Sequence, residues 1–329
     1  MLRIAVPSDG PLHESTLLFM KSCGIGVSRT NIRKYTAQIP SLNGVVVHFQ
    51  RGADIPGKVE EGSSDMGIVG KDRFLESKTI DSKARVIIEK LGYGHSELVL
   101  GIPDSWIDVE SLSDLADLST EFRQRGMDLR ISTKYPRLVE RFLINQQVNY
   151  FSLIPSTGTL EAAPAMGYAD IIADISSTGT TLRENRLKTI HGGSVISSQA
   201  CLISNNSLIG TNTKKFDLAK SVVERIEAHL KALNFCTVTA NIKGDSVDSI
   251  SSYILQHGEI SGLQGPTISQ VFTDGGKKWF SVTVIIQKEN LLRAVELFRQ
   301  IGGTSVTVSQ QDYIFDSECA GAARLAEID

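Results

Sequence analysis

Short apolar runs alternate with helical patterns through the first half of this 329-residue chain. This alternation constrains the fold because it predicts a mostly parallel sheet with helices on both faces. Ligands then bind beyond the carboxyl ends of the strands. Strands are expected at residues 2–6, 45–49, 65–69, 98–102, 129–132, 150–154, 169–175 and 200–203, and helices at residues 14–22, 55–61, 136–145 and 161–166. The run at 98–102 is predicted to cross to a second α/β lobe, and the run at 200–203 to return to the first.

A separate module is predicted after a long amphipathic helix at residues 211–235, in which apolar residues recur every four positions. The pattern that follows has the order βαββαβ, which is typical of a ferredoxin-like domain. Its strands are expected at 237–242, 267–273, 280–286 and 305–309, its helices at 247–257 and 290–301, and a hairpin turn at Asp274-Gly275-Gly276. We interpret this module as a ligand-sensing or assembly domain, with a passive oligomerisation domain as the alternative.

The tetrapeptide Ser-Thr-Gly-Thr occurs at residues 156–159 and again at 177–180. The second copy follows the expected strand at 169–175 and precedes a helix start. A glycine there lets backbone N–H groups turn inward, and hydroxyls and the helix N-terminus complete a phosphate cradle. Asp174, at the end of the strand, is placed to bind a sugar hydroxyl. The alternative is an ordinary turn in which Ser and Thr cap a helix.

Bulk composition argues against several classes of protein. The formal net charge of −3 gives no sign of a basic surface for nucleic acid. No apolar run approaches the roughly 20 residues of a membrane helix. The four cysteines and six histidines are scattered without metal-ligand spacing. Because the N-terminus leads straight into a strand without a secretory leader, we expect a cytoplasmic protein that binds neither nucleic acid nor membrane.

A wider stretch, residues 161–182, holds Glu161, Gly167, Asp174 and the second tetrapeptide, and it resembles the signature of ATP phosphoribosyltransferase. Segments within 51–72, 130–136, 199–203 and 265–268 are similar to the same family, and the last resembles the regulatory domain of its long form. The resemblance implies an α/β, two-lobed, periplasmic-binding-protein-like catalytic part and a C-terminal ferredoxin-like βαββαβ regulatory domain. Lobe I is expected at 1–97 and 190–233, on the ATP side. Lobe II is expected at 98–189, on the side of 5-phosphoribosyl 1-diphosphate (PRPP). The regulatory domain is expected at 236–315, followed by a tail at 316–329.

The resemblance also implies a reaction. N1 of ATP would join C1 of PRPP with loss of diphosphate, in the first step of histidine biosynthesis. Such chemistry needs alignment of two substrates and stabilisation of the departing diphosphate, without an activated side-chain nucleophile. Mg²⁺ is the implied cofactor, bound through the substrate phosphates and not by the protein alone. Feedback inhibition by histidine and a homo-oligomer are implied as well, a hexamer with a dimer as the alternative.

The resemblance implies that two acids act at the catalytic centre. Glu161 and Asp174 would bind the 2′- and 3′-hydroxyls of PRPP; the alternative is that each is a carboxylate at a helix start. The 5′-phosphate would be held by Ser177, Thr178, Gly179, Thr180 and Thr181. Lys134 and Arg137 would meet the diphosphate, although either could equally be a solvated surface charge.

The remaining expected sites lie outside the PRPP pocket. Residues bordering the ATP side would be Arg51, Asp72 and Gly10, with a structural salt bridge as the alternative for the first two. Histidine would bind around Asn241, Ser261, Thr267 and Ser269, for which an ordinary polar strand edge is the alternative.

One segment departs from the family pattern. Many members carry a Lys-Gly-Arg-Leu-like segment after the first strand, where this chain has Ser8, Asp9, Gly10, Pro11 and Leu12. Both cations are absent, and an acid beside a triphosphate is unfavourable unless a metal intervenes. Either the cations are compensated elsewhere or nucleotide binding is altered. The alternative function is therefore a non-catalytic two-lobed small-molecule-binding protein; an enzyme that needs a separate regulatory subunit is disfavoured by the C-terminal module.

Overall fold

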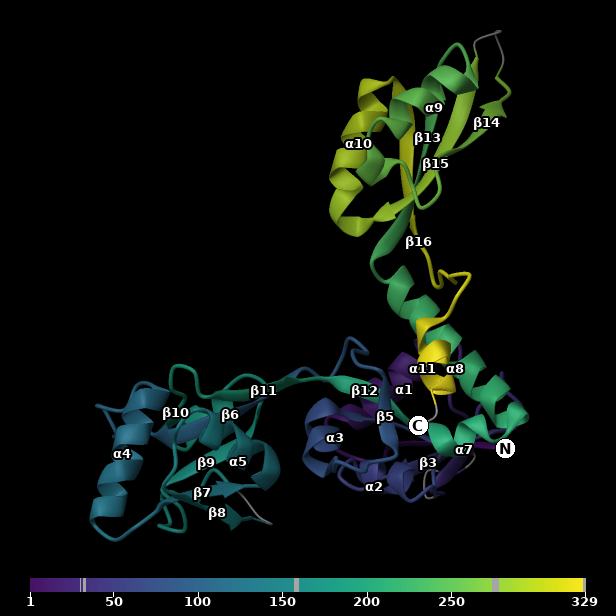
Figure 1. The fold of residues 1–329 in the computed structure, drawn as a ribbon. Helices are drawn as coiled ribbons and strands as arrows, with labels where there is room; N and C mark the ends of the chain where they lie inside the picture. Colours follow the sequence, from purple (N-terminus) through teal and green to yellow (C-terminus); the bar gives the residue numbers. More distant parts are fainter. Residues whose placement is uncertain (30, 32–33, 157–159, 274–277, 328–329) are drawn as a thin grey trace. The chain divides into compact units, whose positions relative to one another are not determined.

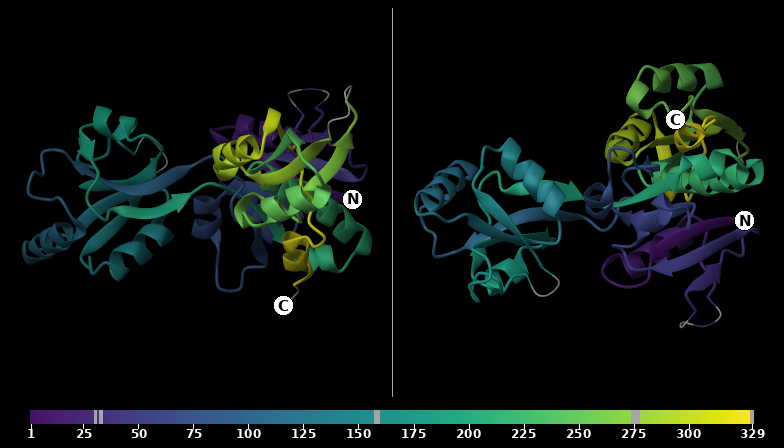
Figure 2. Two further views of the ribbon diagram at one scale, coloured as in Figure 1. Left: turned by 90° about the horizontal axis from the view of Figure 1, so that it is seen from above. Right: turned by 60° about the horizontal axis from the view of Figure 1, so that its bottom comes forward.

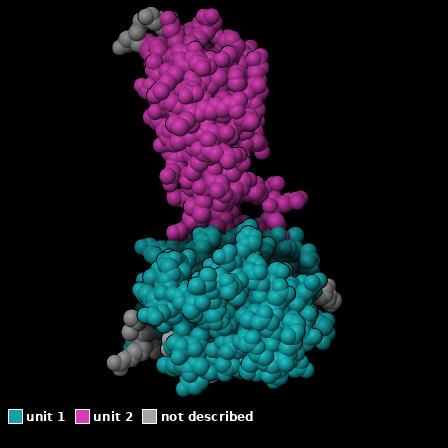
Figure 3. All heavy atoms as spheres, turned by 90° about the vertical axis from the view of Figure 1, so that its left-hand side faces the viewer, with its two compact units in different colours: residues 1–21, 25–220, 323–329 teal, residues 22–24, 221–322 magenta. Residues whose placement is uncertain are grey.

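The computed structural model describes residues 1–29, 31, 34–156, 160–273 and 278–327, and it forms two compact units (Figure 1). Unit 1 comprises residues 1–21, 25–220 and 323–329, and unit 2 comprises residues 22–24 and 221–322 (Figure 3). The C-terminal end of the chain therefore belongs to the same unit as its N-terminal end. In the part of the chain that is described, no helix is both long and apolar enough to span a bilayer.

The first sheet of unit 1 has the strand order β2-β3-β1-β4-β12-β5. Its strands are β1 (Leu2–Pro7), β2 (Thr36–Gln38), β3 (Val45–Gln50), β4 (Met66–Gly70), β5 (Ala84–Ile88) and β12 (Ala200–Asn205), and its helices are α1 (Leu12–Ser22), α2 (Ile55–Glu60), α3 (Lys71–Ser77) and α7 (Asn206–Gly210). Strands β3, β1 and β4 run parallel, whereas β2 and β12 run antiparallel to their neighbours. Strand β5 is antiparallel to β12 and so runs in the same direction as β3, β1 and β4. The sheet is thus mixed around a parallel set of strands, because the chain returns from the second lobe as β12 and enters this sheet from the opposite direction.

The second sheet of unit 1 has the order β10-β6-β9-β7-β8, and β11 also pairs with β6. Its strands are β6 (Ser96–Pro103), β7 (Leu129–Thr133), β8 (Phe151–Pro155), β9 (Ile171–Ser176), β10 (Leu187–Lys188) and β11 (Ser194–Ser198), and its helices are α4 (Leu112–Gln124), α5 (Pro136–Asn145) and α6 (Thr180–Glu184). Strands β8, β7 and β9 are parallel and end at the same edge. Helices lie on both sides of the strands (Figure 2), which encloses an apolar core that includes Leu98, Ile131, Leu143 and Ile171.

Two crossovers connect these sheets. The chain passes from β5 to β6 and later from β11 to β12, so the two-lobed arrangement and the predicted return at 200–203 are confirmed. The predicted helix at 161–166 was wrong, because this segment is a series of turns. Pro164 lies in its middle, where it has no N–H to donate and disfavours a continuous helix. The turns close instead through Met166 N–H to the Ala162 carbonyl and Gly167 N–H to the Pro164 carbonyl.

Unit 2 contains the βαββαβ module, and its strand order β14-β15-β13-β16 confirms the ferredoxin-like pattern. The elements are β13 (Phe235–Lys243), α9 (Val247–Leu255), η1 (Gly258–Ile260), β14 (Thr267–Val271), β15 (Trp279–Gln287), η2 (Lys288–Asn290), α10 (Leu291–Gln300) and β16 (Gly303–Gln310). Alternate residues of β13 and β15, such as Val238 and Val284, are buried with Ile254 and Phe298 of the helices. The predicted hairpin turn at Asp274-Gly275-Gly276 lies outside the described residues.

Two helices link the units along the chain. Helix α8 (Thr213–Ala232) begins in unit 1 and ends in unit 2, slightly inside the predicted range of 211–235. Helix α11 (Ala320–Ala326) occupies the C-terminal tail, where no element was predicted. In unit 1, the Asn206 side chain donates hydrogen bonds to the carbonyls of Arg324 and Glu327, at 2.7 and 3.0 Å, and Leu325 is fully buried.

Candidate active site

The loop between β9 and α6 forms one wall of a polar pocket. Gly179 is the N-cap of α6 with φ +71°, a left-handed conformation that favours glycine. Its N–H donates to Ser176 Oγ at 2.9 Å, and the hydroxyl oxygens of Thr178 and Thr180 lie 3.0 Å apart. Strand, loop and helix start thus follow in the predicted order. The first Ser-Thr-Gly-Thr copy has three of its residues, 157–159, outside the described part of the chain.

Two carboxylates share this pocket with the loop. The cavity of about 80 Å³ is lined by Glu161, Asp174 and residues 175–182. Asp174 Oδ1 accepts a hydrogen bond from the Ile175 N–H at 2.8 Å. Burial raises the pKa of Asp174, although this hydrogen bond and the positive charge of Lys134 act in the opposite direction. The pocket therefore combines donors suited to a phosphate with carboxylate acceptors suited to sugar hydroxyls.

Strand pairing brings Lys134 to the same edge as Asp174. Thr133 of β7 pairs with Ala173 of β9, and the Thr133 hydroxyl donates to the Ala173 carbonyl at 2.8 Å. Lys134 and Asp174 are the next residues along these two parallel strands. The two residues therefore occupy adjacent positions, Lys134 directly after β7 and Asp174 within β9.

Arg137, the other predicted diphosphate ligand, is engaged with α3. Its backbone N–H donates to Glu76 Oε1 at 3.0 Å, and its Nη1 donates to the carbonyls of Glu76 and Ser77 at 3.4 Å each. The Leu138 N–H donates to the other oxygen of the Glu76 carboxylate at 3.0 Å. Glu76 of lobe I thus caps the N-terminus of α5 in lobe II.

Asp72 is buried at the start of α3, where it joins elements of both lobes. Its Oδ2 accepts a hydrogen bond from the Tyr135 hydroxyl at 2.7 Å, and its Oδ1 accepts one from the Ser198 hydroxyl at 2.6 Å. Burial and the negative charge of Asp72 raise the pKa of Tyr135, so its hydroxyl stays protonated and donates. Asp72 was predicted as a site residue, but neither of these two partners was predicted from the sequence. Tyr135 lies inside the segment 130–136 that resembles the family, but no local pattern indicates its contact.

The other two residues expected on the ATP side lie on loops at the carboxyl edge of the first sheet. Gly10 has φ +74° in the loop after β1, with open space around it. Arg51 is exposed directly after β3. The Ser8 N–H donates to the Gln50 carbonyl at 2.7 Å, which ties the first loop to the end of β3. Gly10 and Arg51 therefore belong to neighbouring loops.

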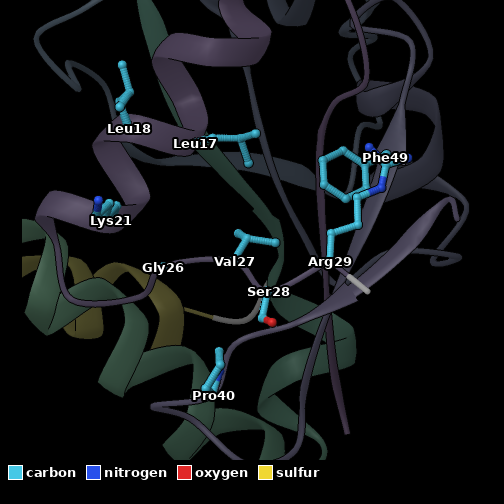
Figure 4. Close-up of a pocket in the computed structure, with 9 residues that line it drawn as sticks. All are labelled: Leu17, Leu18, Lys21, Gly26, Val27, Ser28, Arg29, Pro40 and Phe49. Atoms are coloured by element: carbon cyan, nitrogen blue, oxygen red, sulfur yellow. The ribbon is translucent and has the colours of Figure 1, made fainter. Parts of the chain in front are cut away.

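Two further hollows lie in unit 1. One, of about 550 Å³, shares residues 176–179 with the polar pocket and is also lined by His95, Glu97, Arg183 and Ser198. The other is a mostly apolar groove of about 500 Å³ beside α1 (Figure 4), lined by Leu17, Leu18, Lys21, Gly26, Val27, Ser28, Arg29, Pro40 and Phe49. In that groove the Arg29 guanidinium lies 4.1 Å from the centroid of the Phe49 ring.

Three of the four residues expected to bind histidine share one face of the unit 2 sheet. Asn241 pairs with Ser281, which pairs with Ser269, and Thr267 pairs with Thr283 in the next row. These positions alternate with the buried ones, so they lie on the face opposite the helices. Ser261 lies outside the sheet, at the end of η1, and its hydroxyl donates to the Gly258 carbonyl at 2.9 Å.

The fold and the pocket define a class, a two-lobed α/β protein with a polar site of the kind that suits a sugar phosphate. Comparison with known proteins identifies the family. Residues 51–228 match the family described as ATP phosphoribosyltransferase, and residues 232–311 match the HisG C-terminal domain. The chain belongs to the ATP phosphoribosyltransferase family. This confirms the prediction of a transferase that catalyses the first step of histidine biosynthesis. It also confirms the prediction of the C-terminal domain of the long form.

Individual relatives agree with this assignment. ATP phosphoribosyltransferase 1, chloroplastic, of Arabidopsis thaliana is 36% identical over 323 residues, which cover 96% of this chain and 78% of that protein. ATP phosphoribosyltransferase of Nitrobacter hamburgensis is 30% identical over 319 residues, covering 96% and 95%. Among solved structures, the ATP phosphoribosyl transferase (HisG:HisZ) complex from Thermotoga maritima contains a chain with 25% identity and a TM-score of 0.51, covering 69% of this chain and 99% of that one.

Proposed function

We propose that PRPP binds in the pocket formed by Glu161, Asp174 and the loop at 177–181. The observation that carries this proposal is that both carboxylates and the loop line one cavity. Backbone N–H groups and hydroxyls suit the 5′-phosphate, and carboxylates suit the 2′- and 3′-hydroxyls as hydrogen-bond acceptors. On the phosphate side the ligands would be Ser177, Thr178, Gly179, Thr180 and Thr181.

In the proposed reaction, N1 of ATP attacks C1 of the bound PRPP while the bond from C1 to the diphosphate oxygen breaks. Positive charge develops on the ribose, and negative charge on the leaving group. Glu161 and Asp174 would stabilise the positive charge on the ribose through its hydroxyls. Lys134 would stabilise the negative charge on the leaving diphosphate by its ammonium charge. Most of the acceleration would come from alignment of the two substrates, since no side-chain nucleophile is required.

ATP is proposed to bind where the loops carrying Gly10 and Arg51 meet the start of α3. Asp72 lies there, and its contacts with Tyr135 and Ser198 support a role in holding the two lobes in register at this site. Arg51 would supply positive charge to the phosphates from its exposed position after β3.

Mg²⁺ is the proposed cofactor. The pocket offers carboxylate and hydroxyl oxygens, the ligand type that Mg²⁺ prefers. Over the described residues, no group of three or more His, Cys, Asp or Glu is arranged to hold a metal. The substrate phosphates would supply ligands of the ion, whose charge would offset that of the diphosphate, while Glu161 and Asp174 bind the ribose hydroxyls.

Histidine is proposed as a feedback inhibitor that binds to unit 2 around Asn241, Ser261, Thr267 and Ser269. Amide and hydroxyl groups on one sheet face suit the ammonium and carboxylate of an amino acid. Asn241→Ala and Ser269→Ala should weaken inhibition in initial-rate assays without lowering the uninhibited rate. Ser252→Ala, at an exposed position of α9, is the matched control. Unchanged inhibition in both test variants would place the histidine site elsewhere.

The assembly is proposed to be a homo-oligomer, a hexamer with a dimer as the alternative, in the cytoplasm. Light scattering of the purified protein with and without histidine measures the mass directly. A monomer under both conditions would rule out the oligomer.

The deciding experiment follows formation of the adduct. Protein, ATP, PRPP and Mg²⁺ are mixed with a pyrophosphatase, and the ultraviolet absorbance of the product is recorded. Absorbance should grow with the wild type and not with the Glu161→Gln, Asp174→Asn double variant. Calorimetric binding of PRPP without any adduct would instead support the non-catalytic binding protein.

A further inference from the structure

Arg73 is a cation in the first turn of α3, beside Tyr135 and Asp72. Its guanidinium carbon lies 4.2 Å from the centroid of the Tyr135 ring, and its Nε lies 4.0 Å from Asp72 Oδ2. At that distance the contact with Asp72 is electrostatic and not a hydrogen bond. The oxygens of Asp72 already accept the Tyr135 and Ser198 hydroxyls. The aromatic ring of Tyr135 therefore orients the guanidinium of Arg73. The N–H donors of this guanidinium are not used by the Asp72 carboxylate.

The position of Tyr135 places Arg73 near the proposed PRPP pocket. Tyr135 is two residues beyond Thr133, whose strand partner Ala173 immediately precedes Asp174. The positive charge of Arg73 also acts on the pKa of Asp174, lowering it against the larger effect of burial. Positive charge from Arg73 of lobe I and from Lys134 of lobe II thus acts on the same carboxylate of β9.

Positive charge is scarce on the neighbouring loop. Residues 8–12 after β1 carry Asp9 and no Lys or Arg. Leu12, the first residue of α1 after this loop, has a side-chain carbon 3.7 Å from where a Cβ of Gly70 would be, so the end of the loop borders the start of α3. A diphosphate leaving group needs cations aimed at it, and Arg137, expected for this task, is engaged with Glu76 and Ser77.

We propose that Arg73 binds the diphosphate of PRPP, in place of the cations that the loop after β1 lacks. The guanidinium fork matches two phosphate oxygens at once, and stacking on Tyr135 reduces the freedom lost on binding. This proposal rests on the proposed PRPP pocket. In this arrangement lobe I contributes directly to the site of the leaving diphosphate. Without Arg73, the pocket of lobe II binds ribose 5-phosphate but holds PRPP weakly.

The test compares two ligands that differ only in the diphosphate. Calorimetry with PRPP and with ribose 5-phosphate, both with Mg²⁺, is applied to wild type, Arg73→Gln, Arg73→Lys and the control Lys71→Gln. Lys71 is the adjacent cation of α3 and is paired with Glu89. Arg73→Gln should lose about 10-fold or more in PRPP affinity and keep its ribose 5-phosphate affinity. Arg73→Lys should lose less, and Lys71→Gln should match wild type for both ligands.

Rescue provides a second measurement. Adding Ser8→Lys to Arg73→Gln restores a cation on the loop after β1 and should recover part of the PRPP affinity. Unchanged PRPP affinity in Arg73→Gln would overturn the proposal. An equal loss for both ligands would also overturn it, because Arg73 would then act through Asp174 or the fold. If the wild-type protein binds neither ligand, the proposed PRPP pocket is itself wrong, and the role of Arg73 is wrong with it.

Discussion

At Asp174, burial and neighbouring cations act on one carboxyl group in opposite directions. Burial is the larger effect, so the pKa of Asp174 is raised above that of an ordinary aspartate. The neutral form consequently persists to a higher pH than it would in water. Only the ionised form accepts hydrogen bonds at both oxygens, so binding of a sugar diol should depend on this pKa.

Asp174→Asn should weaken PRPP binding by about 10-fold or more, because one charged hydrogen bond is lost. Wild-type affinity should fall as pH decreases through the raised pKa of Asp174, at a higher pH than for an ordinary carboxyl, and the Asn variant should lack this step. Calorimetry across pH measures both effects. The matched control is Asp128→Asn, an exposed carboxylate paired with Arg123. If the Asn variant keeps wild-type affinity, Asp174 does not contact the ribose.

Gly179→Val should abolish binding of the 5′-phosphate, because a side chain prevents the close approach of backbone to phosphate. Strain alone must be separated from this effect. Gly126→Val is the control, since Gly126 has a similar φ of +74° with open space around it. Crystals of each variant soaked with PRPP report the occupancy. A normally filled phosphate site in Gly179→Val would contradict the assignment of the loop.

At the scale of elements, α3 organises the junction between the lobes. Asp72 and Glu76 are four residues apart and therefore lie on one face of the helix. The first accepts hydrogen bonds from Tyr135 and Ser198, and the second caps the N-terminus of α5. One turn of helix in lobe I thus contacts both a crossover strand and a helix of lobe II.

Glu76→Ala should lower the free energy of unfolding by about 1 kcal/mol, the usual cost of losing a helix cap. The physical reason is that two N–H groups of α5 lose their carboxylate partner. Urea denaturation followed by circular dichroism measures this change. Glu121→Ala removes an exposed carboxylate paired with Arg125 and should cost less than about 0.5 kcal/mol. Equal effects in the two variants would show that the cap contributes nothing specific.

At the scale of the whole molecule, the C-terminal end of the chain, from Ala323 on, belongs to unit 1. Asn206 binds two carbonyls near the end of α11, and Arg324 Nε donates to the Ile87 carbonyl of β5 at 2.5 Å. A truncation near Phe235, which would remove the proposed histidine site, would therefore also remove part of the packing of lobe I. Point substitutions on the unit 2 sheet avoid this complication.

Leu325→Ala should destabilise unit 1 by roughly 2 kcal/mol or more, because the side chain is fully buried. Leu292→Ala is the control, since this leucine of α10 is 76% exposed and should change stability by less than about 0.5 kcal/mol. Thermal unfolding in the presence and absence of PRPP measures both variants. A Leu325→Ala protein as stable as wild type would mean that the tail only rests on the surface.

Local patterns allowed much of the fold and the polar pocket to be predicted from the sequence. Apolar periodicity located most strands and the ferredoxin-like order, and α5 at 136–145 agrees with its predicted range. The loop at 177–181 could be found because its glycine, hydroxyls and preceding acid are contiguous. Pro164 is the local signal against a helix at 161–166, because it has no N–H to donate.

Contacts between distant residues were decided only by the tertiary structure. Asp72 lies 126 positions from Ser198, and Arg137 lies 61 from Glu76, so no periodicity links either pair. Whether Lys134 or Arg137 reaches Asp174 depends on strand register and on which helix carries a competing carboxylate. Burial of Leu325 depends likewise on the return of the chain to unit 1. The sequence by itself determined the elements and the contiguous loop, because short-range backbone preferences specify them; three-dimensional packing decided which charges remain available to a substrate.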